Sequence, residues 1–358
     1  MIILVLSAKG GGTGCALRAR YIAEAFEKRG HQVHFIKPIP SLPLWFDMVL
    51  SAFYYFWISL WVKSDVAIAI KPYPTVVPGL FVQKCKGAKV TIDVDDLDYD
   101  YSHGWFRALH KWLQEPWPKW ADLVTYHNPH LREPLQKVFK VPAKKLVCLP
   151  QGVDGGLFHP GPLKMDDLPR AGAALKNRNG KGPILTFTAH LSVACDLEPL
   201  MESFKLIQRS LPGVQLLVAG GGPDEGRFKR LALDMGIAPA VHFTGYLTPR
   251  QVAACLKLSD AALVYYKDSS VNQYRASMKL REAIACGCRV VAADVGETIL
   301  FKKALFPSPP NPAAFSKAVL RALKARKSPR EAALLVKTLD WTRCIQDLEE
   351  RLRQLCVT

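Results

Sequence analysis

The sequence predicts an α/β protein built from two doubly wound domains in series. Short β-branched and aliphatic runs alternate with helical patterns over the first 150 residues, and the alternation restarts at residue 184. Between the two series lies a stretch rich in Pro, Gly, Lys and Arg, from His159 to Pro183, that lacks a sustained apolar period, as is typical of a linker. Strand–helix alternation predicts parallel sheets covered on both faces.

The first half contains six predicted strands and a clear first helix. The strands are Ile2–Leu6, Val33–Ile36, Val66–Ile70, Val90–Ile92, Leu123–Tyr126 and Leu146–Leu149. The first helix is expected over Cys15–Arg29, because apolar residues recur there at helical spacing and Gly30 follows as a stop.

The second half repeats the pattern with five predicted strands. They are Ile184–Thr188, Gln215–Ala219, Val241–Phe243, Ala262–Tyr265 and Arg289–Ala292. In doubly wound sheets, ligands bind at the carboxyl ends of the strands. Two such domains that face each other would therefore form a cleft between those ends.

Composition limits the class of protein. The 358 residues suit two domains, and 49% hydrophobic with 22% charged residues describes a globular chain. The net charge of +17 favours an anionic partner. A repeated aromatic-plus-basic pattern and zinc-ligand spacing are both missing from the sequence, so we expect no nucleic-acid binding. Phosphate-bearing small molecules and anionic lipid surfaces account better for the charge.

Cysteine usage and the N-terminus indicate a reducing compartment. The nine cysteines are odd in number and scattered, and none forms a CxxC pair, which predicts buried thiols. The chain begins directly with a strand, so we expect no signal peptide and a cytoplasmic location.

Two glycine-rich turns follow predicted strands. The first is KGGGTG, Lys9 to Gly14. It lacks the Gly-Lys-Ser/Thr of a P-loop, which argues against an ATPase. The second is AGGGP, Ala219 to Pro223, with Arg227 one turn further on. Each is consistent with either a tight strand–helix turn or a backbone that approaches a phosphate closely.

The segment Ser277–Gly287, SMKLREAIACG, carries the most chemistry. Lys279 and Glu282 are three residues apart and share a helix face. A lysine is a mobile charge suited to a diphosphate, and a carboxylate can accept from two ribose hydroxyls. The alternative is an exposed ion pair, worth a few tenths of a kcal/mol.

Five segments in order resemble the GT-B glycosyltransferases, specifically the GT4-like group 1 family, over nearly the whole chain. They are PQGVD with Phe158 and Pro160, LVAGGGP at 217–223, VHFTGYL at 241–247, SMKLREA at 277–283 and Asp340-Trp341. The resemblance implies two Rossmann-like domains facing across a cleft. It assigns acceptor binding to residues 1–160, nucleotide-sugar binding to 161–340, and a helix that returns to the N-terminal domain to 341–358.

The resemblance also implies a donor site without cofactor or metal, in which lysines and helix dipoles meet the charge of the leaving group. Its donor-binding residues are Gly11, Gly12, Gly14, His190, Gly221, Gly222, Arg227, Tyr246, Tyr274, Ser277, Met278, Lys279, Leu280 and Glu282. Glu282 would bind the ribose and Lys279 the diphosphate. Tyr274 replaces a glutamate that usually contacts the donor sugar, and the segment 189–196 lacks the usual Arg and Lys-Gly. Retention is favoured on family grounds, while the sugar, base and linkage stay open.

The aspartate-rich run from Asp93 to Asp100 is the candidate acceptor site. It follows a predicted strand, and His103 comes shortly after. We expect Asp95 or Asp96 to orient the acceptor hydroxyl, so the candidate catalytic residues are Asp95, Asp96, His103 and Lys279. The alternative is a solvated loop with a helix cap. The text Asp-Val-Asp also matches the metal motif of another transferase fold, which we interpret as coincidence.

The stretch Pro43–Val62 has one charge, Asp47, in twenty residues and eight aromatic residues. Because it lies inside a sheet domain, it is either a core helix or a helix in a bilayer interface. We favour the interface, with Lys63, Lys71, Lys84, Lys86 and Lys89 facing anionic lipid. This predicts a peripheral protein at the inner face of the membrane with a lipid-linked or membrane-surface acceptor.

Two other functions remain open at this point. One is a nucleotide-sugar epimerase of the same fold, which would convert donor without acceptor. The other is a non-catalytic nucleotide-sugar-binding protein, suggested by Tyr274.

Overall fold

The computed structural model describes residues 1–8, 14–37, 44–177, 182–192, 195–325 and 329–357. Unit 1 comprises Met1–Gly152, Tyr274–Ala276 and Trp341–Thr358, and unit 2 comprises Val153–Gln273 and Ser277–Asp340. The first division falls after Gly152 and not at residue 160 as expected. The physical reason is that Val153 and Phe158 are buried in a hydrophobic cluster of unit 2.

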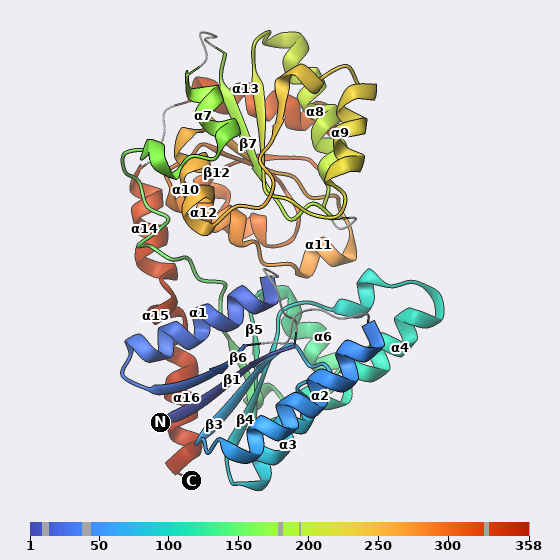
Figure 1. The fold of residues 1–358 in the computed structure, drawn as a ribbon, viewed down its shortest axis with the longest axis vertical. Helices are drawn as coiled ribbons and strands as arrows, with labels where there is room; N and C mark the ends of the chain where they lie inside the picture. The colour runs from blue at the N-terminus through green and yellow to red at the C-terminus, as the bar shows by residue number, and fades with distance from the viewer. Residues whose placement is uncertain (9–13, 38–43, 178–181, 193–194, 326–328, 358) are drawn as a thin grey trace. The chain divides into compact units, whose positions relative to one another are not determined.

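Unit 1 contains a six-stranded parallel sheet in the order β2-β1-β3-β4-β5-β6 (Figure 1). The strands are β1 (Ile2–Ser7), β2 (Gln32–Ile36), β3 (Val66–Ile70), β4 (Lys89–Val94), β5 (Leu123–Tyr126) and β6 (Leu146–Cys148). β3 is fully buried along its length, as expected of a parallel strand covered on both faces. All six lie where the sequence predicts strands, within one or two residues.

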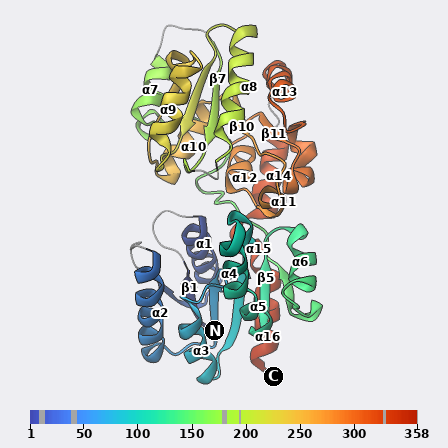
Figure 2. The same ribbon diagram turned by 90° about the vertical axis from the view of Figure 1, so that its right-hand side faces the viewer.

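Helices cover both faces of this sheet (Figures 1 and 2). They are α1 (Gly14–Lys28), α2 (Leu44–Trp61), α3 (Val77–Cys85), α4 (Gly104–Gln114), α5 (Pro116–Trp120), α6 (Arg132–Lys137), α15 (Trp341–Cys344) and α16 (Gln346–Val357). Short 3₁₀ turns η1 (Asp98–Tyr101), η2 (Pro129–Leu131) and η3 (Ala143–Lys145) join them. The C-terminal segment belongs to unit 1, as the sequence predicts.

The carboxylate of Glu349 joins α16 to the rest of unit 1. It pairs with Arg29, with His31 Nε2 at 2.8 Å and with Arg353 Nη2 at 2.7 Å. Burial alone would raise the pKa of Glu349, but hydrogen bonds from Arg353, His31 and Arg29 outweigh it and lower the pKa to about 2.

We therefore expect Glu349→Gln to destabilise the protein by about 2 kcal/mol at pH 7. A carboxyl with a depressed pKa contributes stability above its unfolded value, near 4, and loses it as the pH falls toward 2. The difference between wild type and variant should thus shrink as the pH is lowered from 5 to 3. Urea denaturation at several pH values measures this. A pH-independent difference would contradict the assignment.

The two ends of unit 2 lie side by side. Val153 and Asp340 form a parallel bridge, and the Val153 N–H donates to Leu339 O at 2.8 Å. On the unit 1 side, the Trp341 ring lies so close to Gly152 that a Cβ there would be 2.5 Å from it. Trp341 also stacks on Tyr21 at 5.6 Å. Glycine at 152 is therefore required by this close packing.

Unit 2 contains a second six-stranded parallel sheet, in the order β12-β11-β10-β7-β8-β9. The strands are β7 (Ile184–Thr188), β8 (Gln215–Ala219), β9 (Val241–Phe243), β10 (Ala261–Val264), β11 (Val290–Ala293) and β12 (Leu305–Ser308). Its helices are α7 (Arg170–Asn177), α8 (Leu197–Ser210), α9 (Glu225–Asp234), α10 (Pro249–Leu258), α11 (Ser270–Tyr274), α12 (Met278–Ala285), α13 (Pro312–Lys324) and α14 (Pro329–Leu339). The 3₁₀ elements are η4 (Met165–Asp167), η5 (Ala238–Ala240) and η6 (Gly296–Ala304).

Two expectations for this half were wrong. The stretch from His159 to Pro183 is not a plain linker, because it contains η4 and α7, and Leu175 of α7 is buried in a cluster of unit 2. The sixth strand, β12, was missed because Pro307 interrupts a short apolar run. β12 tolerates a proline since it is an edge strand.

Candidate functional site

The N-terminus of α12 is the centre of the predicted donor site. Ser277 caps the helix, because its Oγ accepts from the Leu280 N–H at 3.2 Å. The Tyr266 hydroxyl donates to the same Oγ at 2.7 Å, and both residues are buried. A capped helix start of this kind presents its remaining N–H groups and the positive end of its dipole to an anion.

Lys279 and Glu282 lie on the first turns of α12, each half-buried. Lys279 Nζ lies 4.9 Å from the ring centroid of Phe187 and 5.2 Å from that of Tyr266. Aromatic faces of this kind stabilise a cation. Burial raises the pKa of Glu282 to about 7, and the charge of Lys279 opposes that rise. Both side chains are therefore less exposed than in the alternative interpretation, an exposed surface ion pair between Lys279 and Glu282.

Met278 and Leu280 differ in what they can offer a ligand. Met278 is half-buried, whereas Leu280 is fully buried in a hydrophobic cluster of unit 2. The backbone N–H of Leu280 already donates to Ser277. Leu280 therefore anchors α12 to its own domain.

The Gly220–Gly222 turn follows β8 and packs against the segment after β7. A Cβ at Gly220 would lie 1.9 Å from Ala189 O, and one at Gly222 would lie 2.1 Å from Leu191 O. Gly220 also has φ +137°, a conformation open to glycine. The turn thus requires glycine for its own packing, whether or not it borders a phosphate.

The remaining unit 2 candidates surround this turn. A Cβ at Gly221 would lie 2.7 Å from the backbone N of Tyr246. His190 and Tyr246 are exposed, with ring centroids 6.2 Å apart. Arg227 is half-exposed and already pairs with Glu198 at 2.6 Å and with Asp224 at 3.6 Å. Arg227 would have to give up these partners to bind a diphosphate.

The donor candidates of the N-terminal half lie in unit 1. Gly14 is the first residue of α1, and a Cβ there would have open space around it. Gly11 and Gly12 lie outside the described residues. Tyr274 belongs to unit 1, where it packs against the hydrophobic cluster that contains Tyr99. The segment 274–276 is held there by a hydrogen bond from Asn128 to Arg275 O at 3.2 Å.

The predicted acceptor residues surround a buried lysine, Lys71, which the sequence predicts to face lipid. Lys71 Nζ lies 3.0 Å from Asp95, 3.9 Å from Asp96 and 2.8 Å from Asp98. We call these four residues the Lys71 cluster. It lies where β3 and β4 end, so Lys71 is not available to lipid. Its φ of +73° is rare for a residue with a side chain.

Within this cluster the three aspartates differ. Asp98 accepts from Lys71 and from Gln114 Nε2 at 3.1 Å. Burial raises the pKa of Asp95 to about 7, with Lys71 opposing and the other aspartates adding to the rise. Asp96 has the largest exposed side-chain fraction of the three, at 21%. Burial is thus the main reason that Asp95 holds a proton readily, and the neighbouring carboxylates add to it.

The structure does not bring His103 into the Lys71 cluster. His103 is the exposed residue before α4, and its side chain does not cap that helix. Asp93, the first residue of the aspartate run, has a separate partner. It accepts from Arg18 Nε at 2.7 Å and Nη2 at 2.9 Å, and from Thr125 Oγ1 at 2.6 Å. Asp93 therefore has a structural role.

Across the described ranges of the chain, no group of three or more His, Cys, Asp or Glu side chains is placed to hold a metal ion. In the Lys71 cluster the ammonium group lies among the carboxylates.

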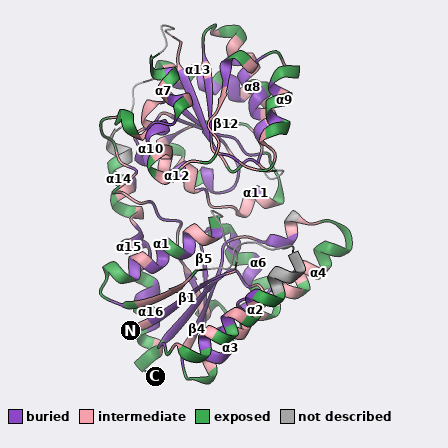
Figure 3. Cartoon of the chain, in the orientation of Figure 1, coloured by how far each residue is buried: buried purple, intermediate pink, exposed green. Residues whose placement is uncertain are grey.

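Buried and exposed residues both lie along helix α2 (Figure 3), and its exposed side chains are apolar. Ser51, Tyr55 and Ser59 are buried, and Gly79 of α3 lies against Ser59 and Tyr55. The exposed side chains are Val49, Leu50, Phe53, Phe56, Trp57, Leu60 and Trp61. The core-helix alternative is wrong for these residues, because Trp57 is 52% and Trp61 78% exposed. Among the described residues, no helix is long and apolar enough to cross a membrane.

Helix α4 also has exposed aromatic side chains. Trp105, Phe106 and Trp112 are exposed at 67%, 53% and 70%. At its end the buried Gln114 donates to Asp98, which links α4 to the Lys71 cluster, while the exposed Arg107 donates to Asp100.

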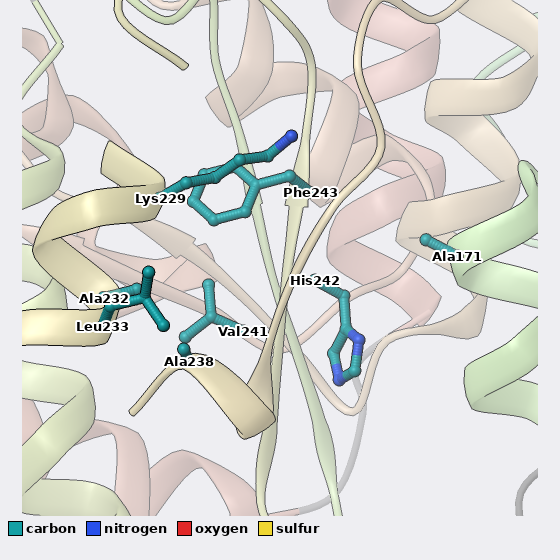
Figure 4. Close-up of a pocket in the computed structure, with 8 residues that line it drawn as sticks. All are labelled: Ala171, Lys229, Ala232, Leu233, Ala238, Val241, His242 and Phe243. Carbon is teal, nitrogen blue, oxygen red and sulfur yellow. The ribbon is translucent and has the colours of Figure 1, made fainter. Parts of the chain in front are cut away.

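A shallow pocket lies elsewhere on unit 2 (Figure 4). It has a volume of about 390 Å³ and is lined by residues of α7, α9, η5 and the edge strand β9. Lys229 and Phe243 border it, with Lys229 Nζ 5.7 Å from the Phe243 ring. None of the predicted donor residues lines this pocket.

The fold of the chain is shared with solved structures. Solved structures of glycosyltransferase type share the fold over almost the full chain. Sucrose-phosphate synthase from Thermosynechococcus elongatus matches with a TM-score of 0.74 at 18% identity, covering 99% of this chain and 98% of that one. Anabaena HepE in complex with UDP and glucose matches with a TM-score of 0.76 at 16% identity, covering 99% and 100%. The chain therefore has the GT-B fold.

The sequence of unit 2 resembles a known family. Residues 174–333 match the model of the family Glycosyl transferases group 1. Over 188 residues the chain is 28% identical to the GDP-mannose-dependent alpha-(1-6)-phosphatidylinositol monomannoside mannosyltransferase of Mycobacterium tuberculosis, covering 51% of this chain and 47% of that protein. It is 25% identical over 154 residues to the alpha-monoglucosyldiacylglycerol synthase of Streptococcus pneumoniae, covering 43% and 33%. The matches span about half the length, or less, of these curated relatives.

Proposed function

We propose that the protein transfers a sugar from a nucleoside-diphosphate sugar to a lipid-linked or membrane-surface acceptor, with retention at the anomeric carbon. The observation that carries this proposal is the start of α12, inside a group 1 domain. There a capped helix end, Lys279 and Glu282 lie within the first two turns of the helix. Two curated relatives have names that specify lipid acceptors, a phosphatidylinositol monomannoside and a diacylglycerol product.

The division of labour on the donor follows from the two side-chain environments. Lys279 lies over two aromatic rings, and its ammonium would stabilise charge on the departing diphosphate. Glu282 would accept from the ribose hydroxyls. Its pKa of about 7 means that ligand hydrogen bonds to the ionised form would favour deprotonation. Gly14, Gly221 and Gly222, with Gly11 and Gly12, would border the diphosphate.

On the acceptor side, Asp95 and Asp96 would orient the attacking hydroxyl. Asp96 is the more exposed of the two, and Asp95 changes protonation near neutral pH. Lys71 holds both and was not among the candidates from the sequence. His103 is exposed and would act on the acceptor from outside the Lys71 cluster. We expect transfer to proceed without an added metal, and full activity in EDTA would support this.

Membrane association is supported by the exposed apolar side chains of helices α2 and α4. An apolar face toward solvent costs free energy unless an apolar medium covers it. Lys63 is exposed next to the end of α2, while Lys86 caps its last carbonyls, with Nζ 2.8 Å from Ser59 O. Lys84 pairs with Asp122, so Lys63 and Lys89 are better placed than Lys84 to meet anionic lipid. The protein would then lie on the cytoplasmic face of the membrane.

We expect the double variant Trp57→Ser, Trp61→Ser to bind anionic liposomes at least about tenfold more weakly than wild type, since each exposed indole contributes apolar area. Co-sedimentation with phosphatidylglycerol vesicles measures this, and binding should weaken at high salt. Leu233→Ser is the matched control, because Leu233 is an exposed apolar residue of α9 in unit 2. Equal partitioning to neutral and anionic vesicles would count against the electrostatic part.

One assay separates this function from the alternatives. The protein is incubated with UDP-, GDP- and ADP-sugars, with and without a membrane lipid extract. A transferase consumes one donor and labels lipid only when extract is present. An epimerase converts donor without extract, and a binding protein retains nucleotide without consuming it. Failure to bind any nucleoside diphosphate would overturn the proposal.

A further inference from the structure

A buried ion pair holds the first turn of α12 in place. Arg281 Nη1 and Nη2 each lie 2.8 Å from the carboxylate of Glu297, and both side chains are at most 3% exposed. Arg281 comes from α12 itself and Glu297 from η6, directly after β11. The guanidinium also lies over the Phe301 ring at 4.9 Å. The pair is therefore fixed from two elements of unit 2.

Both partners bind the backbone of the cap residue. The Ser277 N–H donates to Glu297 Oε1, and Arg281 Nη1 donates to Ser277 O at 3.1 Å. The peptide groups on either side of Ser277 are thus set by the ion pair, while the Tyr266 hydroxyl sets its side chain. η6 itself is held close, because a Cβ at Gly296 would lie 2.5 Å from Asn272 O.

The charges matter as much as the positions. Glu297 places a negative charge one residue from the helix end that would receive a diphosphate. An unbalanced carboxylate there would oppose the helix dipole and Lys279, and its effect would be large because the site is screened little by solvent. The bidentate contact with Arg281 neutralises the charge of the Glu297 carboxylate. The helix end and Lys279 then remain available to a ligand anion.

We propose that Arg281 and Glu297 are positioning residues of the donor site. Glu297 sets the geometry of the Ser277 cap, and Arg281 neutralises Glu297 so that the helix start attracts a nucleoside diphosphate. The inference rests on the proposed function and adds a charge-balancing pair that touches neither donor nor acceptor. A pair with a merely structural role predicts equal effects from the loss of either partner. Charge balancing predicts unequal effects that depend on the charge of the ligand.

The test compares Arg281→Met, Glu297→Gln and the double variant at pH 8. Calorimetry measures binding of the nucleoside diphosphate found for wild type, the corresponding nucleoside, and inorganic pyrophosphate. We expect Arg281→Met to weaken diphosphate and pyrophosphate binding about tenfold or more and the nucleoside by less than about twofold. Glu297→Gln should leave diphosphate binding within about threefold of wild type. The double variant should recover most of the loss.

Further variants separate charge from folding. Arg281→Lys keeps the charge and should bind the diphosphate within about threefold of wild type. Val319→Ala truncates the core of unit 2 in α13, away from the ion pair, and should lower the unfolding midpoint without changing ligand preference. Equal weakening of nucleoside and diphosphate in Arg281→Met, or equal losses in the two single variants, would overturn the inference alone. A wild type that binds no diphosphate would overturn the proposed function as well.

Discussion

Replacing Lys279 with alanine should lower kcat by about 100-fold or more while changing the affinity for the nucleoside diphosphate by less than about fivefold. The reason is that charge accumulates on the diphosphate as the sugar departs, so the ammonium interacts more strongly in the transition state than with the bound donor. Steady-state kinetics with the donor identified by the sugar panel gives kcat, and calorimetry with the nucleoside diphosphate gives affinity.

Lys229→Ala is the matched control for this measurement. Lys229 is also a lysine of unit 2 that lies over an aromatic ring, but it borders the pocket beside β9. It should keep kcat within about twofold of wild type. A Lys279→Ala enzyme with normal turnover would remove Lys279 from the catalytic residues, whatever its effect on donor binding.

Replacing Asp95 with asparagine should lower turnover about 100-fold and at the same time stabilise the protein by about 1 kcal/mol at pH 8. The pKa of Asp95 rises from its ordinary value near 4 to about 7 in the folded protein. Over that interval the folded state binds more protons than the unfolded state. The free energy of unfolding contributed by Asp95 therefore falls as the pH rises from about 4 to 7. Asparagine has no ionisable group, so the variant does not lose stability in this way as the pH rises.

Urea denaturation at pH 5 and pH 8, with activity measured on the same samples, tests both halves of this expectation. Asp98→Asn gives the opposite result in stability, since Asp98 accepts from Lys71 and Gln114 and its loss should destabilise the protein. If Asp95→Asn were less stable than wild type at pH 8 and kept its activity, Asp95 would be a structural partner of Lys71 with no role in transfer.

The fold could be predicted from local sequence because parallel strands buried on both faces are continuous apolar runs. β3, for example, has every side chain buried, and its bounds agree with the prediction. β12 escaped because its proline and its short length hide an edge strand. α7 escaped because its short helix contains a single deeply buried leucine, Leu175.

Only part of the candidate site could be predicted from the sequence. The predictable features involve residues close together in the chain, and the others involve residues far apart in it. The cap at Ser277 and the spacing of Lys279 and Glu282 are local, so the helical pattern alone indicates them. Lys71 lies 24 positions before Asp95, and their contact exists only because β3 and β4 end beside each other. Arg281 and Glu297 are likewise joined by the fold, across β11. The sequence held no local signal for either pair.

Because Val153 and Asp340 form a bridge, unit 2 can be described as a domain inserted into the chain of unit 1. The first and last residues of unit 2 are neighbours, joined by the bridge and by the bond from the Val153 N–H to Leu339 O. The chain therefore leaves unit 1 and returns to it at nearly the same point. Apart from the short segment 274–276, the whole of unit 2 is thus a domain with adjoining ends. Adjoining ends are the condition under which domains can be exchanged. A lineage could in this way replace unit 2 while keeping the sheet of unit 1 and its apolar helices unchanged.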